Sequence, residues 1–571
     1  MQTLDRLFLH GMLVALSLTA ETLCGAVAHD AQMRLYLSNH DQRPEHHIVH
    51  AIVGMTNFVY DADGALEKIR GEAIAFCVRD CENVTIRNVR IDWERPCFTE
   101  VKVLGFGYGT TRVAIDQSLY PFVIADGRLL MTGLGWTNAV HKAKLFDGRT
   151  REHLPGVGDV VYDGAARELA DGTVELLKDF SSFGVGLKVG DVIVFRPRLR
   201  DFPAIVVADS KNVTLEDVVI HDAKGMGLLA QRSENVAWRG SRSASAKTSG
   251  VFPRPGSYAS SHADASHFSN IKGVVTVENC WFEGMMDDAI NVHSTCLAVT
   301  NAIGRRTIVC HYAHSQSIGL DLFHEGEMVR FLRGSIMETG PEIKVAGVRC
   351  LGPRDVEIVL ADDIPVGWGV GDAVENADWQ PAVRFCGNVV SRNRARGACF
   401  TTPKSVLVES NLFDRVTGAA LLFAGDAQFW YESGACRDVT VHGNVFSNCC
   451  TCARCHGRSH GIISISPNVT DLANLRIGYH RNFKIVGNTF VGFDWPILYA
   501  MAADGIVVRD NEISYNMPMN ELSQYIFRAC HNVEIDGRRV SGDTVVDRDL
   551  ARFGIPVGKW HLNPAKKGKK E

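Results

Sequence analysis

An asparagine recurs at nearly regular intervals in the last third of the chain, and this spacing limits the fold more than any other feature. It stands at Asn388, Asn411, Asn444, Asn488 and Asn511, so the intervals are 23, 33, 44 and 23 residues. Each asparagine separates two short apolar runs. Short apolar runs, a turn residue and a period near 23 residues are typical of the coils of a parallel β-helix. No single coil can bury its apolar face alone, so the stacked coils must form the core.

The same pattern occurs earlier in the chain. Residues 83–89 and 212–218 both begin with Asn-Val-Thr, and residues 274–282 continue an equivalent apolar run. Successive coils lie about 4.8 Å apart, so we expect an asparagine at the same corner of each coil to form a ladder of side-chain hydrogen bonds. The longer intervals of 33 and 44 residues indicate coils with outward loops.

Two stretches interrupt this period, at residues 97–203 and 296–381. Each contains a glycine, an acidic residue and an apolar run in succession, at 190–195 and 326–331. Structureless loops of this length are uncommon in compact proteins, so we interpret both stretches as inserted β-barrel-like modules. The 53 glycines against 18 prolines fit a chain with many turns and few helices.

These features predict an all-β chain that forms one coil stack with two insertions. The predicted segments are a leader at 1–30, first coils at 31–96, a first module at 97–203, coils with the candidate site at 204–295, a second module at 296–381, C-terminal coils at 382–545 and a tail at 546–571.

The N-terminus and the net charge bear on location and partners. Residues 7–20 are mostly apolar and an Ala-Val-Ala site follows at 26–28, as in a signal peptide, but Asp5 beside Arg6 leaves the preceding region without net positive charge. A periplasmic or secreted location and a cytoplasmic one therefore both stay open. No other segment approaches 18 apolar residues, so we expect no membrane span. The net charge of −5 argues against a nucleic-acid partner.

The densest group of cysteines lies at residues 449–456, where two C-x-x-C spacings overlap and a histidine follows. Such spacing can bind zinc, but a structural zinc site normally joins two such pairs from different segments, and the sequence contains no second pair. We favour a cysteine-rich loop with a local disulfide, and we expect no bound metal and no cofactor.

Asp264, Asp287 and Asp288 form the constellation with the clearest chemistry. Asp287 and Asp288 follow Asp264 by 23 and 24 residues, which is one coil. The three carboxyl groups should therefore share one patch on adjacent coils. Like charges this close disfavour joint ionisation, so at least one pKa should rise, and the set can supply both an acid and a base. Because consecutive strand residues point to opposite faces, Asp287 and Asp288 both reach that patch only if the backbone bends there.

Such a set fits inverting glycoside hydrolysis. One protonated carboxyl group donates to the glycosidic oxygen while one or two carboxylates deprotonate a water, with the two functions about 6.5–9.5 Å apart. A structural role is the alternative, because aspartates in β-helix turns also serve as caps or calcium ligands. Spacing alone does not decide between the two.

Four runs together resemble the α-1,3-galactosidases of glycoside hydrolase family 110. They are residues 264–268, the Asp-Asp-Ala-Ile-Asn-Val-His run at 287–293, Ile-Asp-Trp-Glu-Arg-Pro at 91–96 and Phe-Trp-Tyr-Glu-Ser-Gly at 429–434. The similarity extends from residue 35 to near residue 540. It implies a right-handed parallel β-helix with inserted β-barrels. It also implies exo action, with inversion, on terminal α-1,3-linked galactose, as in blood-group B type glycans.

The resemblance also implies roles for individual residues. Asp264, Asp287 and Asp288 match the family's catalytic aspartates, and we assign Asp287 as the general acid, with Asp264 and Asp288 holding the water. Trp430 and Glu432 match a substrate-binding run, because an indole face suits the apolar face of galactose and a carboxylate suits its hydroxyls. Packing at the edge of a coil is the alternative role for Trp430.

His293 and two other function classes complete the expectations. His293 could hydrogen-bond the substrate or orient an aspartate, and a purely structural role is an equal alternative. A β-helix polysaccharide lyase or epimerase would need a basic side chain and calcium, and the runs 262–268 and 286–293 contain no lysine or arginine. A non-catalytic glycan-binding adhesin would keep its ligand after Asp287 is replaced. Pairing of two copies into a homodimer through a coil end or a module also stays open.

Overall fold

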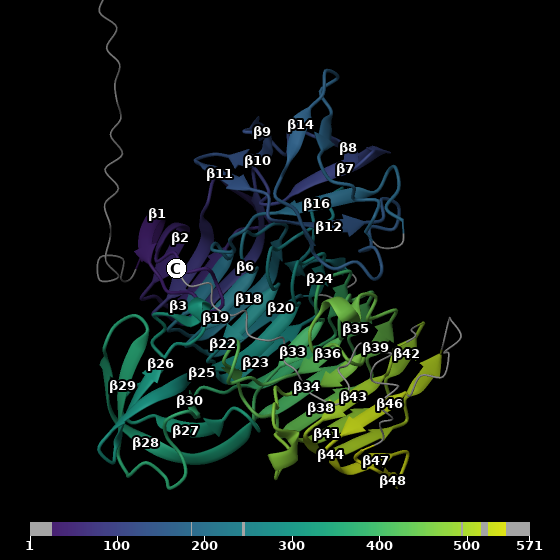
Figure 1. The fold of residues 1–571 in the computed structure, drawn as a ribbon. Coiled ribbons are helices and arrows are strands. Elements are labelled where there is room, and N and C mark those ends of the chain that lie inside the picture. The colour runs from purple at the N-terminus through teal and green to yellow at the C-terminus, as the bar shows by residue number, and fades with distance from the viewer. Residues whose placement is uncertain (1–25, 184–185, 242–245, 493–494, 515–523, 544–571) are drawn as a thin grey trace, which may run out of the picture.

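The computed structural model describes residues 26–183, 186–241, 246–492, 495–514 and 524–543 (Figure 1). Within these ranges the chain forms β-strands and short 3-10 turns, without an α-helix. Most strands stack as a parallel β-helix from which two modules project, so the predicted fold class is confirmed. No helix among the described residues is long and apolar enough to cross a membrane.

The coil stack has three parallel faces. The first face carries the candidate site and consists of β2 (Glu45–Val53), β5 (Ile74–Arg79), β17 (Ile205–Ala208), β19 (Leu228–Gln231), β22 (Ser266–Ser269), β25 (Ile290–Ile303), β33 (Ala398–Phe400), β36 (Leu421–Phe423), β40 (Ile463–Ile465), β43 (Leu498–Met501) and β46 (Tyr525–Arg528). The second face consists of β3 (Thr56–Asp61), β6 (Glu82–Trp93), β18 (Lys211–Ile220), β20 (Glu234–Arg239), β23 (Lys272–Glu278), β31 (Ala382–Cys386), β34 (Ser405–Glu409), β38 (Asp438–His442), β41 (His480–Val486), β44 (Ala503–Arg509) and β47 (His531–Ile535).

The third face is made of shorter strands. It begins at β4 (Leu66–Ile69), which pairs with the end of β6, and includes the end of β18. It continues through β21 (Gly250–Val251), β24 (Trp281–Glu283), β32 (Val389–Ser391), β35 (Leu412–Asp414), β39 (Val445–Ser447), β42 (Thr489–Val491) and β45 (Glu512–Ser514). The corners between the faces are where the chain leaves the repeat, so they can carry long insertions without breaking the ladders.

The predicted asparagine ladder runs through the C-terminal coils. The Asn388 side chain donates to Oδ1 of Asn411 at 3.1 Å, and Asn411 donates to Asn444 at 2.9 Å. Asn444 donates to Asn488 at 2.9 Å, and Asn488 donates to Asn511 at 3.0 Å. Each buried amide therefore pairs with the next coil, which sets the register of the stack.

A second ladder joins the N-terminal coils on the surface. The side chain of Asn83 donates to Asn57, Asn212 donates to Asn83, and Asn235 donates to Asn212, at 2.8 to 2.9 Å. Here the asparagines themselves adopt positive φ angles of 54° to 55°. Asparagine tolerates this left-handed conformation better than most residues, which explains its use at these corners.

Apolar side chains from all three faces fill the interior of the coil stack. Aromatic rings stack from coil to coil, with centroids 5.2 Å apart between Phe413 and Phe446 and 4.8 Å apart between Phe446 and Phe490. This repeated packing makes the stack a rigid support for side chains that point outward from the first face.

The first module departs from the stack after β6. Its seven-stranded antiparallel sheet contains β7 (Thr99–Gly107), β8 (Thr110–Ile115), β12 (Lys142–Phe146), β13 (Val160–Val161), β14 (Ala166–Glu168), β15 (Val174–Leu176) and β16 (Val192–Arg196). A smaller sheet contains β9 (Phe122–Ala125), β10 (Arg128–Gly133) and β11 (Trp136–Ala139). The module has its own apolar core and lies against the upper part of the coil stack in Figure 1.

The second module is a closed antiparallel barrel. The long strand β25 leaves the first face and continues into it, so the barrel is rigidly joined to the stack. The other members are β26 (Thr307–His311), β27 (Met328–Arg333), β28 (Glu338–Cys350), β29 (Asp355–Leu360) and β30 (Ala373–Asn376), and the 3-10 turn η2 (Ser315–Ser317) follows β26.

The remaining elements lie at the ends and in loops. β1 (Ala26–Arg34) pairs antiparallel with β2, β37 (Glu432–Ser433) pairs with β25, and β48 (Arg538–Val540) pairs with β47. The 3-10 turns η3 (Ala453–Cys455) and η4 (Leu472–Asn474) lie in C-terminal loops, and Cys452 forms a disulfide with Cys455. Most of the predicted leader and nearly all of the predicted tail lie outside the described residues.

Candidate active site

Three charged residues occupy the same corner of three successive coils. The register of β22 with β25 pairs Ser266 with Ile290, which places Asp264 and Asp288 at equivalent positions. The register of β25 with β33 pairs Ile290 with Ala398, which brings Arg396 to that corner on the next coil. The backbone confirms this stacking, because the Ala265 amide donates to the Asp288 carbonyl oxygen at 2.8 Å. The one-coil spacing therefore does bring the aspartates together.

Asp287 reaches the same patch through a bend. Residues 284–289 between β24 and β25 lie outside the strands, so Asp287 and Asp288 do not alternate in direction as strand residues would. The Asn393 side chain donates to the Asp287 carbonyl oxygen at 3.0 Å and holds this bend. One oxygen from each of Asp264, Asp287 and Asp288 lies within 4.8 Å of the others. This distance is shorter than the expected separation of acid and base.

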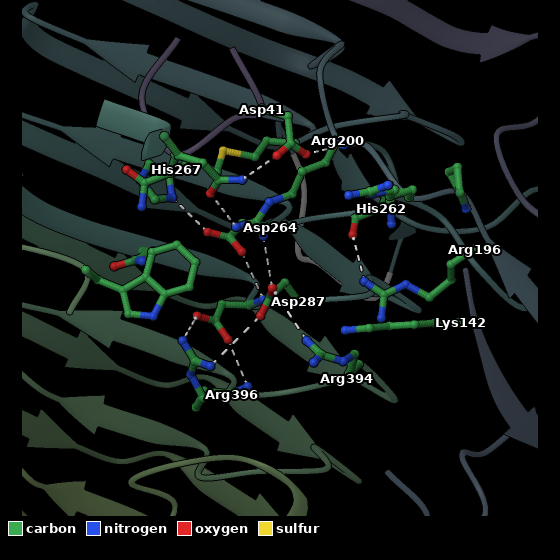
Figure 2. A pocket seen from close by; sticks show the side chains of 18 of the residues that line it. Asp41, Lys142, Arg196, Arg200, His262, Asp264, His267, Asp287, Arg394 and Arg396 are labelled. Carbon is green, nitrogen blue, oxygen red and sulfur yellow. Dashed lines mark hydrogen bonds and ion pairs between the residues drawn. The ribbon is translucent and has the colours of Figure 1, made fainter. Parts of the chain in front are cut away.

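The three aspartates line a cavity of about 390 Å³ (Figure 2). Side chains from distant segments complete its wall, and they are Asn39, Asp41, His141, Lys142, Arg196, Arg198, Arg200, His262, His267, Asn291, Gln316, Arg394, Arg396, Trp430 and Glu432. His141, Lys142 and Arg196 come from the first module, and Gln316 comes from the second. The insertions thus build the walls of a cavity whose floor is the coil stack.

One side of the cavity is made of histidines, which we call the histidine wall (His267 and His293). His267 Nδ1 lies 2.7 Å from Asp264 Oδ2, and His267 Nε2 lies 2.8 Å from His293 Nε2. His293 Nδ1 lies 3.0 Å from the Ser294 carbonyl oxygen, which can only accept. Neutral His293 therefore carries its proton on Nδ1 and accepts from His267 Nε2–H, which leaves His267 Nδ1 as an acceptor.

This direction of hydrogen bonding requires Asp264 to carry a proton. Burial lowers the pKa of His267 well below its usual value, so the ring is neutral and accepts from Asp264. Burial and the nearby Asp287 carboxylate raise the pKa of Asp264 to about 8. The predicted rise of at least one carboxyl pKa is thus confirmed at Asp264.

The opposite side of the cavity is made of arginines, which we call the arginine wall (Arg200, Arg394 and Arg396). Their guanidinium nitrogens lie 3.4, 3.5 and 4.0 Å from the Asp287 carboxylate. Burial alone would raise the pKa of Asp287, but Arg394, Arg396 and Arg200 lower it below its usual value. Asp287 is therefore an anion while Asp264 is neutral.

Asp288 is tied to Arg396. Burial raises the pKa of Asp288, whereas every group near its oxygens is a donor. Arg396 Nη2 lies 2.9 Å from Oδ2, the Arg396 backbone amide donates to Oδ1 at 2.8 Å, and the Cys399 thiol lies 3.2 Å from Oδ2. These donors favour a carboxylate that forms an ion pair with Arg396.

Two family models match the inserted modules. The GLAA-B beta-barrel domain I matches residues 99–193, and the GLAA-B beta-barrel domain II matches residues 307–374. Three curated relatives are named alpha-1,3-galactosidase B. The protein of Akkermansia muciniphila is 38% identical, with alignment over 89% of this chain and 63% of its own length. The proteins of Parabacteroides distasonis and Phocaeicola vulgatus are each 34% identical, over 91% and 84% of this chain and 86% and 82% of their own lengths.

The chain belongs to the α-1,3-galactosidase family. The resemblance inferred from short runs thus extends across both modules and most of the coil stack. The three aspartates that match the family's catalytic positions lie in one cavity, as the spacing predicts.

The other residues carried over from the family differ in placement. Trp430 lines the cavity with 42% of its surface exposed, and its ring packs on His314 at a centroid distance of 4.3 Å. Glu432 also lines the cavity and accepts from the Asn39 side chain at 2.6 Å. His293 does not line it, because it lies behind His267, buried, with Nε2 at 3.7 Å from Glu432. Its position therefore suits orientation of His267 rather than direct contact with a substrate.

The arginine wall is the main feature that sequence reasoning missed. The statement that the constellation lacks basic residues holds for the two sequence runs and is wrong for the folded site. A signal for Arg396 did exist: Asp264-Ala265, Asp288-Ala289 and Arg396-Gly397 precede equivalent strands. The 108-residue interval from Asp288 to Arg396 hides this repeat until the second module is removed from the alignment.

The same arginines make the aspartate cluster a poor cation site. Asp287 and Asp288 are already compensated by guanidinium groups within 4.0 Å, and Asp264 is held in its neutral form. A divalent cation needs ionised oxygen ligands without competing cations beside them. The chemistry available here is instead proton transfer between one neutral and one ionised carboxyl group.

Proposed function

We propose that this protein is an exo-acting α-galactosidase that removes terminal α-1,3-linked galactose, with inversion, from glycans of the blood-group B type. The names of the relatives support the linkage and the sugar. The observation that carries the chemistry is the opposite charge state of two neighbouring carboxyl groups, Asp264 neutral and Asp287 ionised. Hydrolysis of a glycoside needs this combination.

The charge states reverse the roles predicted from the sequence. Asp287 cannot be the general acid at neutral pH, because the arginine wall keeps it ionised. Asp264 holds a proton and is the general acid that donates to the glycosidic oxygen. Asp287 is the general base that takes a proton from water, and Asp288, fixed by Arg396, positions that water. The neutral His267 ring can accept the Asp264 proton and return it between turnovers.

Galactose fits the half of the cavity bounded by Trp430 and Glu432. The half-exposed indole offers an apolar surface for the sugar ring. Glu432 is a carboxylate, because the neighbouring His293, His267 and Arg396 and the Asn39 hydrogen bond lower its pKa despite burial. It can accept hydrogen bonds from sugar hydroxyls. A closed end of this kind admits only a terminal residue, which supports exo action.

The arginine wall does not supply the base that a lyase or epimerase needs. The neighbouring aspartates raise the pKa of Arg394, and they raise that of Arg396 well above its usual value, although burial alone would lower both. Both side chains stay protonated and cannot abstract a proton from a sugar carbon. Hydrolysis is therefore the reaction that these residues support best.

The stereochemistry of the first product tests the proposal. With an α-1,3-linked galactoside as substrate, proton NMR of the fresh product should show β-galactose before mutarotation. The close approach of the carboxyl oxygens makes this measurement decisive, since retaining enzymes place their carboxyl groups about 5 Å apart. First release of α-galactose would mean that Asp287 attacks the sugar itself. No release of galactose from any α-1,3-linked galactoside would refute the proposal as a whole.

A further inference from the structure

A group of cations at one end of the cavity is not explained by the proposed reaction. Lys142, Arg196 and Arg198 line the cavity but form no ion pair with Asp264, Asp287 or Asp288. Figure 2 shows Lys142 and Arg196 on the side of Asp287 that lies away from His267. We call these three residues the cationic end.

The fold places two of these cations in an unfavourable pair. Lys142 of β12 and Arg196 of β16 are direct cross-strand partners in the first module. Like charges directly opposite each other on an antiparallel pair destabilise the sheet. A position that favours neither folding nor the carboxyl chemistry suggests a ligand that needs both charges.

The carboxylate that separates them is already shared. Asp159 lies 3.4 Å from Lys142 and 3.3 Å from Arg196, and it also accepts two hydrogen bonds from Arg394 at 2.9 and 3.1 Å. Arg196 Nε is buried without a hydrogen-bond partner among the described residues. One carboxylate therefore faces three cations, and it leaves an excess of positive charge beside the cavity.

Arg198 adds an accessible cation. Its side chain is exposed and forms no hydrogen bond or ion pair within the described part of the chain. Lys142 has 36% of its side chain exposed, whereas Asp264 and Asp288 are buried at the floor. The cationic end therefore lies toward the opening, where the sugar that carries the terminal galactose must lie if galactose occupies the Trp430 end.

We propose that the cationic end is a subsite for an anionic substituent, a sulfate ester or a carboxylate, on the sugar to which the terminal galactose is linked. This inference rests on the proposed exo-galactosidase function for the direction of the chain. Guanidinium and ammonium groups bind such oxyanions through charge-assisted hydrogen bonds. The net charge of the whole chain is −5, so a general surface charge does not account for this local excess.

Binding of the acceptor sugar alone tests the subsite without catalysis. Calorimetry at low ionic strength would compare methyl β-galactoside, its 6-O-sulfate and the corresponding uronic acid. The wild type should bind at least one of the charged sugars about tenfold more tightly than the neutral one. A gain for the sulfate alone, for the uronic acid alone or for both identifies the preferred oxyanion. Equal binding of all three would overturn the inference.

Variants locate the effect. Arg198→Gln, which removes an exposed side chain without a partner, should reduce the preference for the charged sugar, and Lys142→Met with Arg198→Gln should abolish it. Arg305→Gln removes a largely exposed arginine from the second module and should leave the preference unchanged. A preference that survives the double substitution, or one that 0.5 M NaCl does not weaken, would assign the charge recognition elsewhere.

Kinetics separate this inference from the proposed function. The ratio of kcat/KM for a Galα1-3Gal glycoside with and without the 6-O-sulfate on the inner sugar should exceed one in the wild type and fall in the double variant. Cleavage of both substrates at equal rates would refute the subsite and leave the galactosidase proposal intact. Absence of cleavage together with tight binding of the charged acceptor would do the reverse.

Discussion

The histidine wall and the arginine wall contain the same reactive group in opposite charge states. Asp264 on the histidine wall is buried beside neutral rings and holds a proton, whereas Asp287 on the arginine wall faces three guanidinium groups and does not. Both aspartates come from adjacent coils with the same backbone path. The comparison shows that the coil repeat places the carboxyl groups, while residues from other segments decide which of them is acid and which is base.

The strongest test of this contrast removes each carboxyl group separately. Asp264→Asn and Asp287→Asn should each lower kcat about a thousandfold on a natural glycan, because each removes one half of the acid–base pair. An aryl galactoside with a good leaving group needs little protonation, so it should restore much of the activity of Asp264→Asn and little of Asp287→Asn. Initial rates on both substrates provide the measurement.

An exposed aspartate serves as the control for these variants. Asp438→Asn on the second face should keep full activity on both substrates. Rescue of Asp287→Asn instead of Asp264→Asn by the aryl substrate would return Asp287 to the role of general acid.

Weakening the arginine wall should make Asp287 resemble Asp264. In Arg394→Gln one of the guanidinium groups that lower the pKa of Asp287 is lost, so this pKa should rise. The acid limb of the pH–rate profile should then move to higher pH, and activity near pH 4 should fall roughly tenfold relative to the wild type. Arg384→Gln, on an exposed arginine of the second face, is the matched control. An unchanged acid limb in Arg394→Gln would mean that Asp287 is not the base.

The wild-type pH profile should reflect both walls at once. Activity requires Asp264 protonated, so it is full below the Asp264 pKa of about 8 and falls as pH rises through that value. It also requires Asp287 ionised, and since this pKa is lowered, the loss on the acid side should begin below the usual carboxyl range. Measurement of kcat/KM across the pH range tests both limbs. A basic limb near pH 5 would show that Asp264 is not held protonated.

The smallest expected effect concerns His267, a positioning residue. Its ring accepts from protonated Asp264, whereas the side-chain amide in His267→Gln can donate and would favour the ionised form of Asp264. The basic limb should therefore shift to lower pH with only a few-fold loss of kcat on the plateau. A purely structural role for His267 would lower activity evenly at all pH values and leave the limb in place.

Much of the molecule follows from the sequence pattern alone. The asparagine interval predicts the coil stack and its ladder, because a period near 23 residues allows no other stable arrangement of short apolar strands. The spacing of 23 and 24 residues between Asp264 and the Asp287–Asp288 pair predicts their meeting in space. The two non-repetitive stretches predict insertions, and they match the two barrel models of the family.

The residues that tune the site were beyond the reach of local spacing. Arg396 stands at the corner equivalent to Asp288, but the second module separates the two in sequence. Arg200 follows the first module, and Arg394 approaches from the same late coil as Arg396. His293 has the position expected along its strand, yet only the structure shows that His267 lies between it and the cavity.

The sequence by itself determined the fold, the family and the set of three aspartates. Only the tertiary structure decided that Asp264 is the protonated partner, that Asp287 is the anion and that the cavity carries a cationic end. The physical reason is that a repeat period depends on contacts between neighbouring coils, which recur along the chain. A carboxyl pKa depends instead on burial and on every charge within a few ångströms, and these charges come from segments that the chain brings together only on folding.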